Sequence, residues 1–206
     1  MRIIKRYHFR NFRHRISRNG TLSRPERLLG ALGAGYLIGV AAGAIMSRGM
    51  TDVCAEYLRA FCLPHSVLAC IMDVLRPTLL GAMAFTLTGL SLAGAGTAVG
   101  LLIARGLGVG WLLGGLYQIG TRSASFCALA YVLPMACWTA LLYLIQVRES
   151  IGMAMTLLRA LRETESPLGR LRLYGQRSAV LWGGAVCGSL VQSLIAMAVR
   201  AQIAGG

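Results

Sequence analysis

Long uncharged apolar runs dominate the hydrophobic pattern of this chain. They contain 20, 28, 25 and 22 residues and lie at 28–47, 77–104, 123–147 and 178–199. An apolar helix of about 20 residues is long enough to cross a bilayer. The pattern therefore predicts an all-α polytopic membrane bundle. None of the four runs contains Asp or Glu, so we expect few groups in them that could carry a proton across the membrane.

The charged segments between the apolar runs predict the orientation of the chain. Segment 1–27 carries a net charge of +8, segment 148–177 carries +3, and segment 48–76 is neutral. Because short positive segments stay in the cytoplasm, we expect a basic cytoplasmic tail, an inner amphipathic loop and an outer loop, respectively. The region 77–147 must then cross an odd number of times. Three crossings there give about five transmembrane helices in total.

The transmembrane bundle is expected to cover 28–199 as a single domain, with a short outer tail at 200–206. The N-terminus would then lie inside and the C-terminus outside. An Arg-rich start that is poor in acids is also typical of an organellar transit peptide, and this alternative stays open. The net charge of +14 flanks the apolar runs without any motif that reads bases. It favours anionic lipid headgroups over nucleic acid as the partner of the basic tail.

The middle crossing has two alternatives, which differ in where they place Arg105. A break at Arg105 and Gly106 keeps the charge at an interface and leaves a short segment, 106–121, that either spans or is re-entrant. A break at 94–96 leaves Arg105 at membrane depth, at a cost of about 2.5–3.5 kcal/mol or more. We therefore expect the first break. Arg105 in a water-filled cavity at mid-depth would favour a transporter, whereas Arg105 at the cytoplasmic interface would favour a scaffold.

Two of the charged segments show helical spacing of their apolar residues. Segment 51–63 predicts an amphipathic helix on the outer side. Its residues Tyr57, Leu58 and Phe61 are candidates for contact with a partner protein. Segment 151–165 predicts a basic amphipathic helix that lies in the lipid headgroup layer.

Candidate chemistry is sparse along the chain. His8, His14 and His65 all lie outside the apolar runs, so no intramembrane relay or metal site is expected. Catalytic residues cannot be assembled from the remaining polar side chains, and we expect neither a cofactor nor an enzymatic activity. Cys54 and Cys62 share the outer segment, where they either form a disulfide or remain free thiols.

Glycines recur at four-residue spacing in three places. Such spacing puts them on one stripe of a helix, where a second backbone can approach closely. The three series are Gly35, Gly39 and Gly43; Gly106, Gly110 and Gly114; and Gly184 with Gly188. We expect these stripes to pack helices within the bundle. Association with a partner or with a second copy of the chain, in a homo-oligomer, is the alternative.

The middle of the chain carries an ordered set of short motifs. These are spaced glycines, an Arg-Gly-x-x-x-Gly pattern, a glycine pair and a Leu-Pro pair, at Gly89, Gly94, Arg105, Gly106, Gly110, Gly114, Gly115, Leu133 and Pro134. With the basic tail and the outer amphipathic segment, this order resembles the stage II sporulation protein M family of endospore-forming bacteria, over most of 28–199. The chain departs from that family at Met135 and Ala136, where many relatives carry a polar residue such as His or Asn.

The resemblance implies a non-enzymatic scaffold in the mother-cell membrane at the sporulation septum. Members of that family assemble with the peptidoglycan-degrading sporulation proteins D and P. The complex thins the septal wall and drives engulfment of the forespore. The alternative function is a small membrane transporter or flippase-like protein that uses the glycine-broken middle helices.

Overall fold

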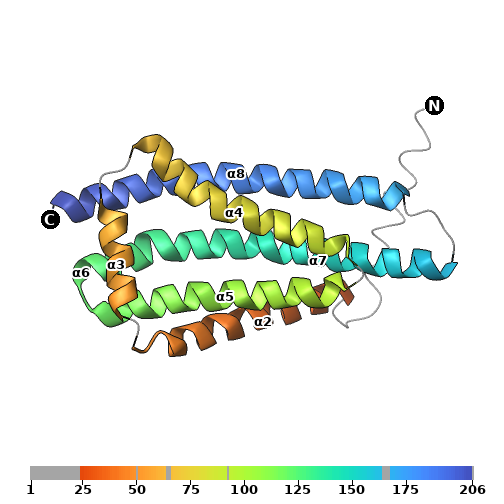
Figure 1. Ribbon diagram of the computed structural model, residues 1–206, viewed down its shortest axis with the longest axis horizontal. Helices are drawn as coiled ribbons and strands as arrows, with labels where there is room; N and C mark the ends of the chain where they lie inside the picture. The colour runs from red at the N-terminus through yellow and green to blue at the C-terminus, as the bar shows by residue number, and fades with distance from the viewer. Residues whose placement is uncertain (1–23, 50, 64–65, 92, 164–167, 206) are drawn as a thin grey trace.

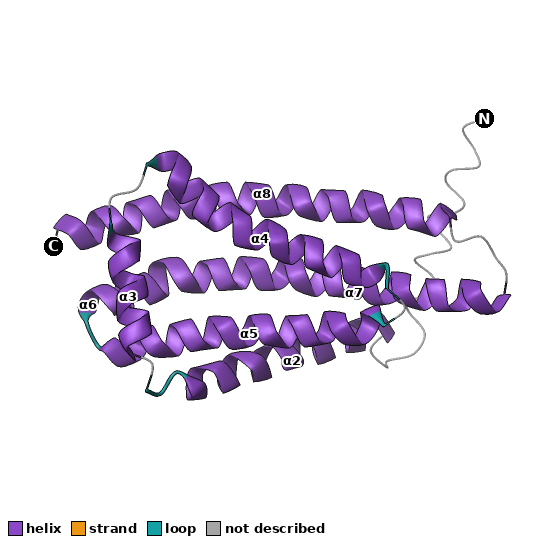
Figure 2. Cartoon of the chain, in the orientation of Figure 1, coloured by secondary structure: helices purple, strands orange, loops and turns teal. Residues whose placement is uncertain are grey.

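The computed structural model describes almost all of the chain beyond residue 23 (Figure 1), namely 24–49, 51–63, 66–91, 93–163 and 168–205. Residues 1–23 of the basic tail, with His8 and His14, lie outside the described residues, as does His65, whereas residues 24–27 belong to a helix. Nearly all of the described residues are helical (Figure 2). The elements are α2 (Arg24–Met46), α3 (Thr51–Cys62), α4 (Val67–Gly89), α5 (Gly94–Ile119), α6 (Arg122–Cys127), the π-helix η1 (Ala128–Val132), α7 (Leu133–Glu163) and α8 (Leu168–Gly205).

Within the described residues, five helical stretches are long and apolar enough to cross a membrane, which agrees with the predicted number. They are Glu26–Met46, Val67–Gly89, Gly94–Ile119, Arg122–Leu161 and Gly169–Ile203. The fourth stretch joins α6, η1 and α7 into one helix. The fold therefore shows the coarse class predicted from the sequence, an all-α bundle of five candidate membrane spans.

The distribution of side chains suits a lipid environment. Large apolar side chains with more than half of their surface exposed include Leu37, Ile38, Leu80, Leu87 and Val180. Polar side chains lie inside the bundle, among them Thr78, Thr139, Gln146, Ser150 and Ser189. Lipid tails accept exposed apolar surface without cost, whereas buried hydroxyl and amide groups need partners from neighbouring helices.

The five long helices run roughly along one axis, and α3 lies across one end of them (Figure 1). Helix α2 packs along α5, while α4 packs against α7 and α8. We call the end that holds α3, α6 and the C-terminal part of α8 the α3 end. The opposite end, which holds the α4–α5 turn and the last turns of α7, is called the hairpin end.

The expected break at Arg105 and Gly106 is wrong. Helix α5 runs without interruption through both residues, so the segment 106–121 is the second half of a 26-residue helix rather than a short or re-entrant one. The chain turns just before Gly94 instead, which is the alternative division. The cost of inserting an arginine into the membrane predicted the helix break at the wrong place. That cost treats the surroundings of Arg105 as lipid, whereas protein side chains surround this position.

Both charged segments between the spans are shorter than predicted. Helix α4 begins at Val67, where the Ser66 side chain accepts a hydrogen bond from the Ala69 N–H at 3.2 Å, so part of the expected outer loop 48–76 belongs to a span. Helices α7 and α8 likewise extend into the expected inner loop 148–177, and α8 continues through most of the expected tail 200–206. Because α4 begins at Val67, Asp73 lies within an apolar helix rather than in a loop.

The predicted amphipathic helix over 51–63 is confirmed as α3, and it buries Cys54 and Phe61. The disulfide alternative is wrong, because Cys54 and Cys62 are free thiols. They lie eight residues apart on one helix, which separates their Cα atoms by about 12 Å. A disulfide requires a Cα separation of about 4.4–6.8 Å.

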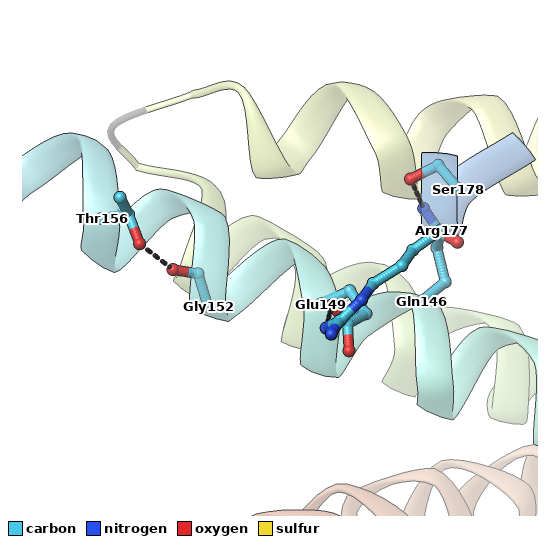
Figure 3. Close-up of polar contacts among 6 residues, drawn as sticks. All are labelled: Gln146, Glu149, Gly152, Thr156, Arg177 and Ser178. Carbon is cyan, nitrogen blue, oxygen red and sulfur yellow. Dashed lines mark hydrogen bonds and ion pairs between the residues drawn. The ribbon is translucent and has the colours of Figure 1, made fainter. Parts of the chain in front are cut away.

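Polar contacts join α7 and α8 toward the hairpin end (Figure 3). The Gln146 side-chain amide donates a hydrogen bond to the Ser178 hydroxyl at 3.1 Å. One turn further along, Arg177 and Glu149 form an ion pair at 2.7 Å. Because more than half of the Arg177 side chain is exposed, this pair contributes little stability, about 0–1 kcal/mol.

Candidate functional site

A cavity of about 380 Å³ lies inside the bundle toward the α3 end. Helices α3, α4, α5 and α7, the π-helix η1 and the end of α8 form its wall. Much of this wall is apolar. The larger polar and charged side chains that line it are Tyr57, Asp73, Arg105, Tyr131, Thr139 and Arg200. A mainly apolar pocket with a few converging polar groups is the usual form of a small-ligand site.

Arg105 lines the cavity from the middle of α5. The central carbon of its guanidinium lies 5.8 Å from the centre of the Tyr143 ring. Its buried Nε atom has no hydrogen-bond partner among the described residues. A ring face stabilises a cation by about 0.5–2 kcal/mol. The ring offers no conventional acceptor for the Nε donor, so the described part of the protein leaves this donor unused.

Arg200 lines the same cavity from the C-terminal part of α8. Its guanidinium carbon lies 4.6 Å from the centre of the Phe61 ring, which in turn packs 4.9 Å from the Tyr131 ring. Its Nε atom is also buried without a partner in the described part of the chain. The ion pair of Arg177 with Glu149 is the only one found across the described ranges, so neither cavity arginine is paired with a carboxylate there.

A π-helical turn, Ala128–Val132, shapes the part of the wall that leads into α7. The N–H of Leu133 donates to the carbonyl of Ala128, five residues earlier. Pro134 follows directly, and a proline ring crowds the carbonyl four residues before it in an ordinary α-helix. The wider π turn relieves this crowding, and such turns are frequent at functional sites. The Leu-Pro motif thus lies next to Tyr131, which faces the cavity.

The mouth of the cavity lies beside α3, α4 and α5, where the lining residues Tyr57, Ala60, Asp73, Pro77 and Gly108 are also exposed. Partial burial raises the pKa of Tyr57 to about 12, a rise that Arg200 opposes. The Tyr57 phenol is therefore protonated at neutral pH and can donate a hydrogen bond at the mouth.

The three candidates for partner contact do not form one free surface. Phe61 is only 6% exposed and packs in the interior, so it offers almost no surface to a partner in this structure. Leu58 is partly buried against the hydrophobic cluster that contains Phe61, and Tyr57 lines the cavity mouth. The apolar face of α3 is already occupied, since it seals the α3 end of its own bundle.

Two of the predicted glycine stripes face each other between α2 and α5. A β-carbon added at Gly43 would lie 2.8 Å from the backbone nitrogen of Trp111, and one added at Gly110 would lie 2.8 Å from the Cα atom of Val40. Gly39 and Gly106 meet the backbones of Ile103 and Tyr36, Gly114 meets Ala44, and Gly35 approaches the Ile103 side chain more loosely. Both stripes are thus used within one chain and are not free to bind a second copy.

The third stripe lies between α7 and α8. Gly188 leaves room for the indole of Trp138, and Gly184 faces the Leu142 side chain at 3.5 Å. The groups that face this stripe are side chains, whereas backbone meets backbone in the α2–α5 pair.

Reasoning from the sequence missed Asp73 and Arg200 as site residues. Asp73 was assigned to a solvated loop, although the Ser66 cap shows that its helix begins earlier. Arg200 follows directly after the last apolar run, 178–199, and in the sequence it marks only where that run ends. A cationic residue near the end of a span and an acidic residue one turn before Pro77 were the available signals, but nothing in the sequence brings α4 and α8 together.

Comparisons with protein-family models, with curated proteins and with solved structures found no match for this chain. The described residues contain no group of three His, Cys, Asp or Glu side chains that could hold a metal ion. The fold defines the class of protein, which is a multi-pass α-helical membrane protein. Its cavity is lined by two arginines and one carboxylate.

Proposed function

We propose that the protein is a non-enzymatic membrane scaffold that recruits peptidoglycan-degrading enzymes, the sporulation proteins D and P, to the septal membrane of the mother cell. The motifs shared with the stage II sporulation protein M family support this proposal. In it the hairpin end faces the cytoplasm, because the Arg-rich segment 148–177 lies there and positive segments remain inside. The C-terminus and α3 then lie outside, next to the cell wall.

The scaffold proposal rests on the two faces of α3, one buried against the bundle and one exposed and charged. One face of this helix is fixed to the bundle through Cys54, which meets Gly115, and through Phe61. The opposite face presents the exposed residues Asp52, Glu56 and Arg59. A rigid helix that offers fixed charges loses little entropy when a partner binds. The docking surface is therefore the charged face of α3 rather than its apolar face.

Reversing the acidic charges on α3 tests the scaffold. In sporulating cells, the Asp52→Lys/Glu56→Lys double variant is expected to lose about tenfold or more of the co-purifying wall hydrolases, because like charges across an interface cost several kcal/mol. Its level in the membrane should not change, since both side chains are exposed.

The matched control keeps both charges and exchanges their lengths, as Asp52→Glu/Glu56→Asp. Recovery of the hydrolases by the control should equal that of the wild type. Equal recovery by the charge-reversed variant would contradict the scaffold proposal. Replacing the whole of α3 is a poorer test, because it would also remove Phe61 from the interior and open the cavity.

A second candidate, a small transporter or flippase-like protein, is favoured by the position of Arg105. This residue lies at mid-helix in α5 and lines a cavity, rather than lying at an interface. The lining residue Asp73 also supplies a carboxylate within a candidate span. Charged groups facing an interior cavity commonly mark a substrate pathway.

Lipid movement in proteoliposomes tests the second candidate. Wild-type protein is expected to accelerate transbilayer movement of a fluorescent anionic phospholipid, and Arg105→Gln should abolish the acceleration because the substrate loses its countercharge. Arg122→Gln, which removes an exposed charge at the α3 end, should behave like the wild type. Wild-type vesicles no faster than protein-free vesicles would rule out this candidate.

A further inference from the structure

The two arginines of the cavity have more hydrogen-bonding capacity than the protein uses. A guanidinium has five N–H donors and no acceptor. In both Arg105 and Arg200 the Nε atom is buried without a partner, and each guanidinium lies against an aromatic ring. Buried polar groups in folded proteins are almost always hydrogen-bonded, so two such donors in one cavity require an explanation.

The net charge of the cavity wall indicates whether a ligand would be an anion or a cation. Arg105 and Arg200 contribute two positive charges to the wall, and Asp73 contributes one negative charge at the mouth. The wall is therefore left with one net positive charge. An apolar wall lowers the local dielectric constant and strengthens the attraction for an anion.

The shape and chemistry of the wall narrow the ligand class further. Guanidinium groups match the oxygens of phosphate through paired N–H donors. The protonated phenol of Tyr57 adds a donor at the mouth, and the apolar residues Val74, Leu112 and Val132 line the space between. A group with one negative charge and an apolar neighbourhood, such as a phosphodiester, fits this combination better than a fully hydrated dianion does.

We propose that this cavity binds the phosphate group of an anionic ligand that enters through its mouth and is held by Arg105 and Arg200. The group belongs to the headgroup of an anionic phospholipid or to a free phosphate. The site goes beyond the scaffold role and does not depend on it. It would give the second candidate function its substrate class, but binding at equilibrium requires no transport.

Ligand binding can be measured on the purified full-length protein in nanodiscs of phosphatidylcholine. One arm titrates short-chain phosphatidylglycerol and the other titrates inorganic phosphate, with short-chain phosphatidylcholine as the neutral control. The dissociation constant is read by native mass spectrometry for the lipid and by equilibrium dialysis for phosphate. Saturable binding in the first arm alone assigns a lipid headgroup, and saturable binding in the second assigns free phosphate.

Variants connect the binding to the cavity. Arg105→Gln and Arg200→Gln should each weaken binding by about tenfold or more, the effect of losing a charged hydrogen bond. Arg122→Gln removes a charge at the same end but outside the cavity, and it should bind like the wild type. Equal weakening by all three variants, or by none, would overturn the proposal, as would the absence of saturable binding in both arms.

A fourth variant keeps both cavity arginines, so it can test the proposal even if the arginine variants do not fold. Asp73→Asn removes the negative charge from the mouth while the side chain keeps its size and its exposure. It is expected to tighten binding of the same probe, because the net positive charge of the wall doubles. Unchanged or weaker binding by Asp73→Asn would overturn the proposal even if the arginine variants cannot be purified.

Discussion

Replacing Gly110 with alanine is expected to destabilise the bundle strongly, whereas the same change at Gly100 in the same helix should not. A β-carbon at Gly110 would lie 2.8 Å from the Cα atom of Val40 and closer still to its carbonyl group. These atoms are backbone, so they can move only if α2 and α5 separate. Overpacking of this kind costs about 1–3 kcal/mol, and sometimes more.

Gly100 provides the matched control because a β-carbon there meets nothing within 4 Å. Alanine is about 0.8–1 kcal/mol more favourable than glycine inside a helix. Gly100→Ala should therefore be neutral or slightly stabilising. Because the helix-propensity gain is the same at both positions, the two variants are expected to differ by the overpacking cost, about 1–3 kcal/mol, when the purified protein is unfolded in a denaturing detergent titration. Superimposable unfolding curves would show that α2 and α5 do not need their close contact.

The α2–α5 contact is also the part of the fold that the sequence predicts best. Four-residue glycine spacing in both helices identified the two stripes, because a close approach of two backbones requires that spacing on each partner. Which stripe meets which could not be derived, since three stripes allow several pairings. The structure pairs Gly39 and Gly43 with the backbone of α5 and leaves Gly184 in a looser contact with Leu142.

The number of spans was predicted correctly, but their boundaries were not. Charge-free runs locate a span only where charges mark its ends. Arg76 and Arg105 lie within candidate spans, so counting from charge to charge shortened α4 and divided α5 in the wrong place. The insertion cost of an arginine depends on whether it meets lipid or a cavity, and this depends on tertiary packing that no single-helix pattern records.

The cavity could not be predicted for the same reason. Its charged residues are separated along the chain and belong to α4, α5 and α8. Two signals in the sequence pointed to this region: Arg105, a charge within a long apolar stretch, and the Leu-Pro pair, which places a proline within an apolar run. The π turn at Ala128–Val132 shows how the chain accommodates that proline, and it brings Tyr131 to the cavity wall.

Replacing Thr86 with valine is expected to destabilise the other half of the bundle by about 1–3 kcal/mol. The Thr86 hydroxyl accepts hydrogen bonds from the Gln146 amide at 2.9 Å and from the Trp182 indole at 3.1 Å. It also donates to the carbonyl of Ala82 at 2.8 Å. One hydroxyl thus joins α4, α7 and α8. Valine has nearly the same shape, so the variant removes the hydrogen bonds and leaves the packing almost unchanged.

Two further variants separate the hydrogen bonds of Thr86 from its packing. Thr86→Ser keeps the hydroxyl and should restore most of the stability. Gln146→Met should cost less than Thr86→Val, because the Gln146 amide oxygen has no partner among the described residues and the change removes this buried acceptor as well. In detergent unfolding, the double variant should be less destabilised than the sum of the two single changes, by about 0.5 kcal/mol or more. Strict additivity would mean that Gln146 and Thr86 do not stabilise each other.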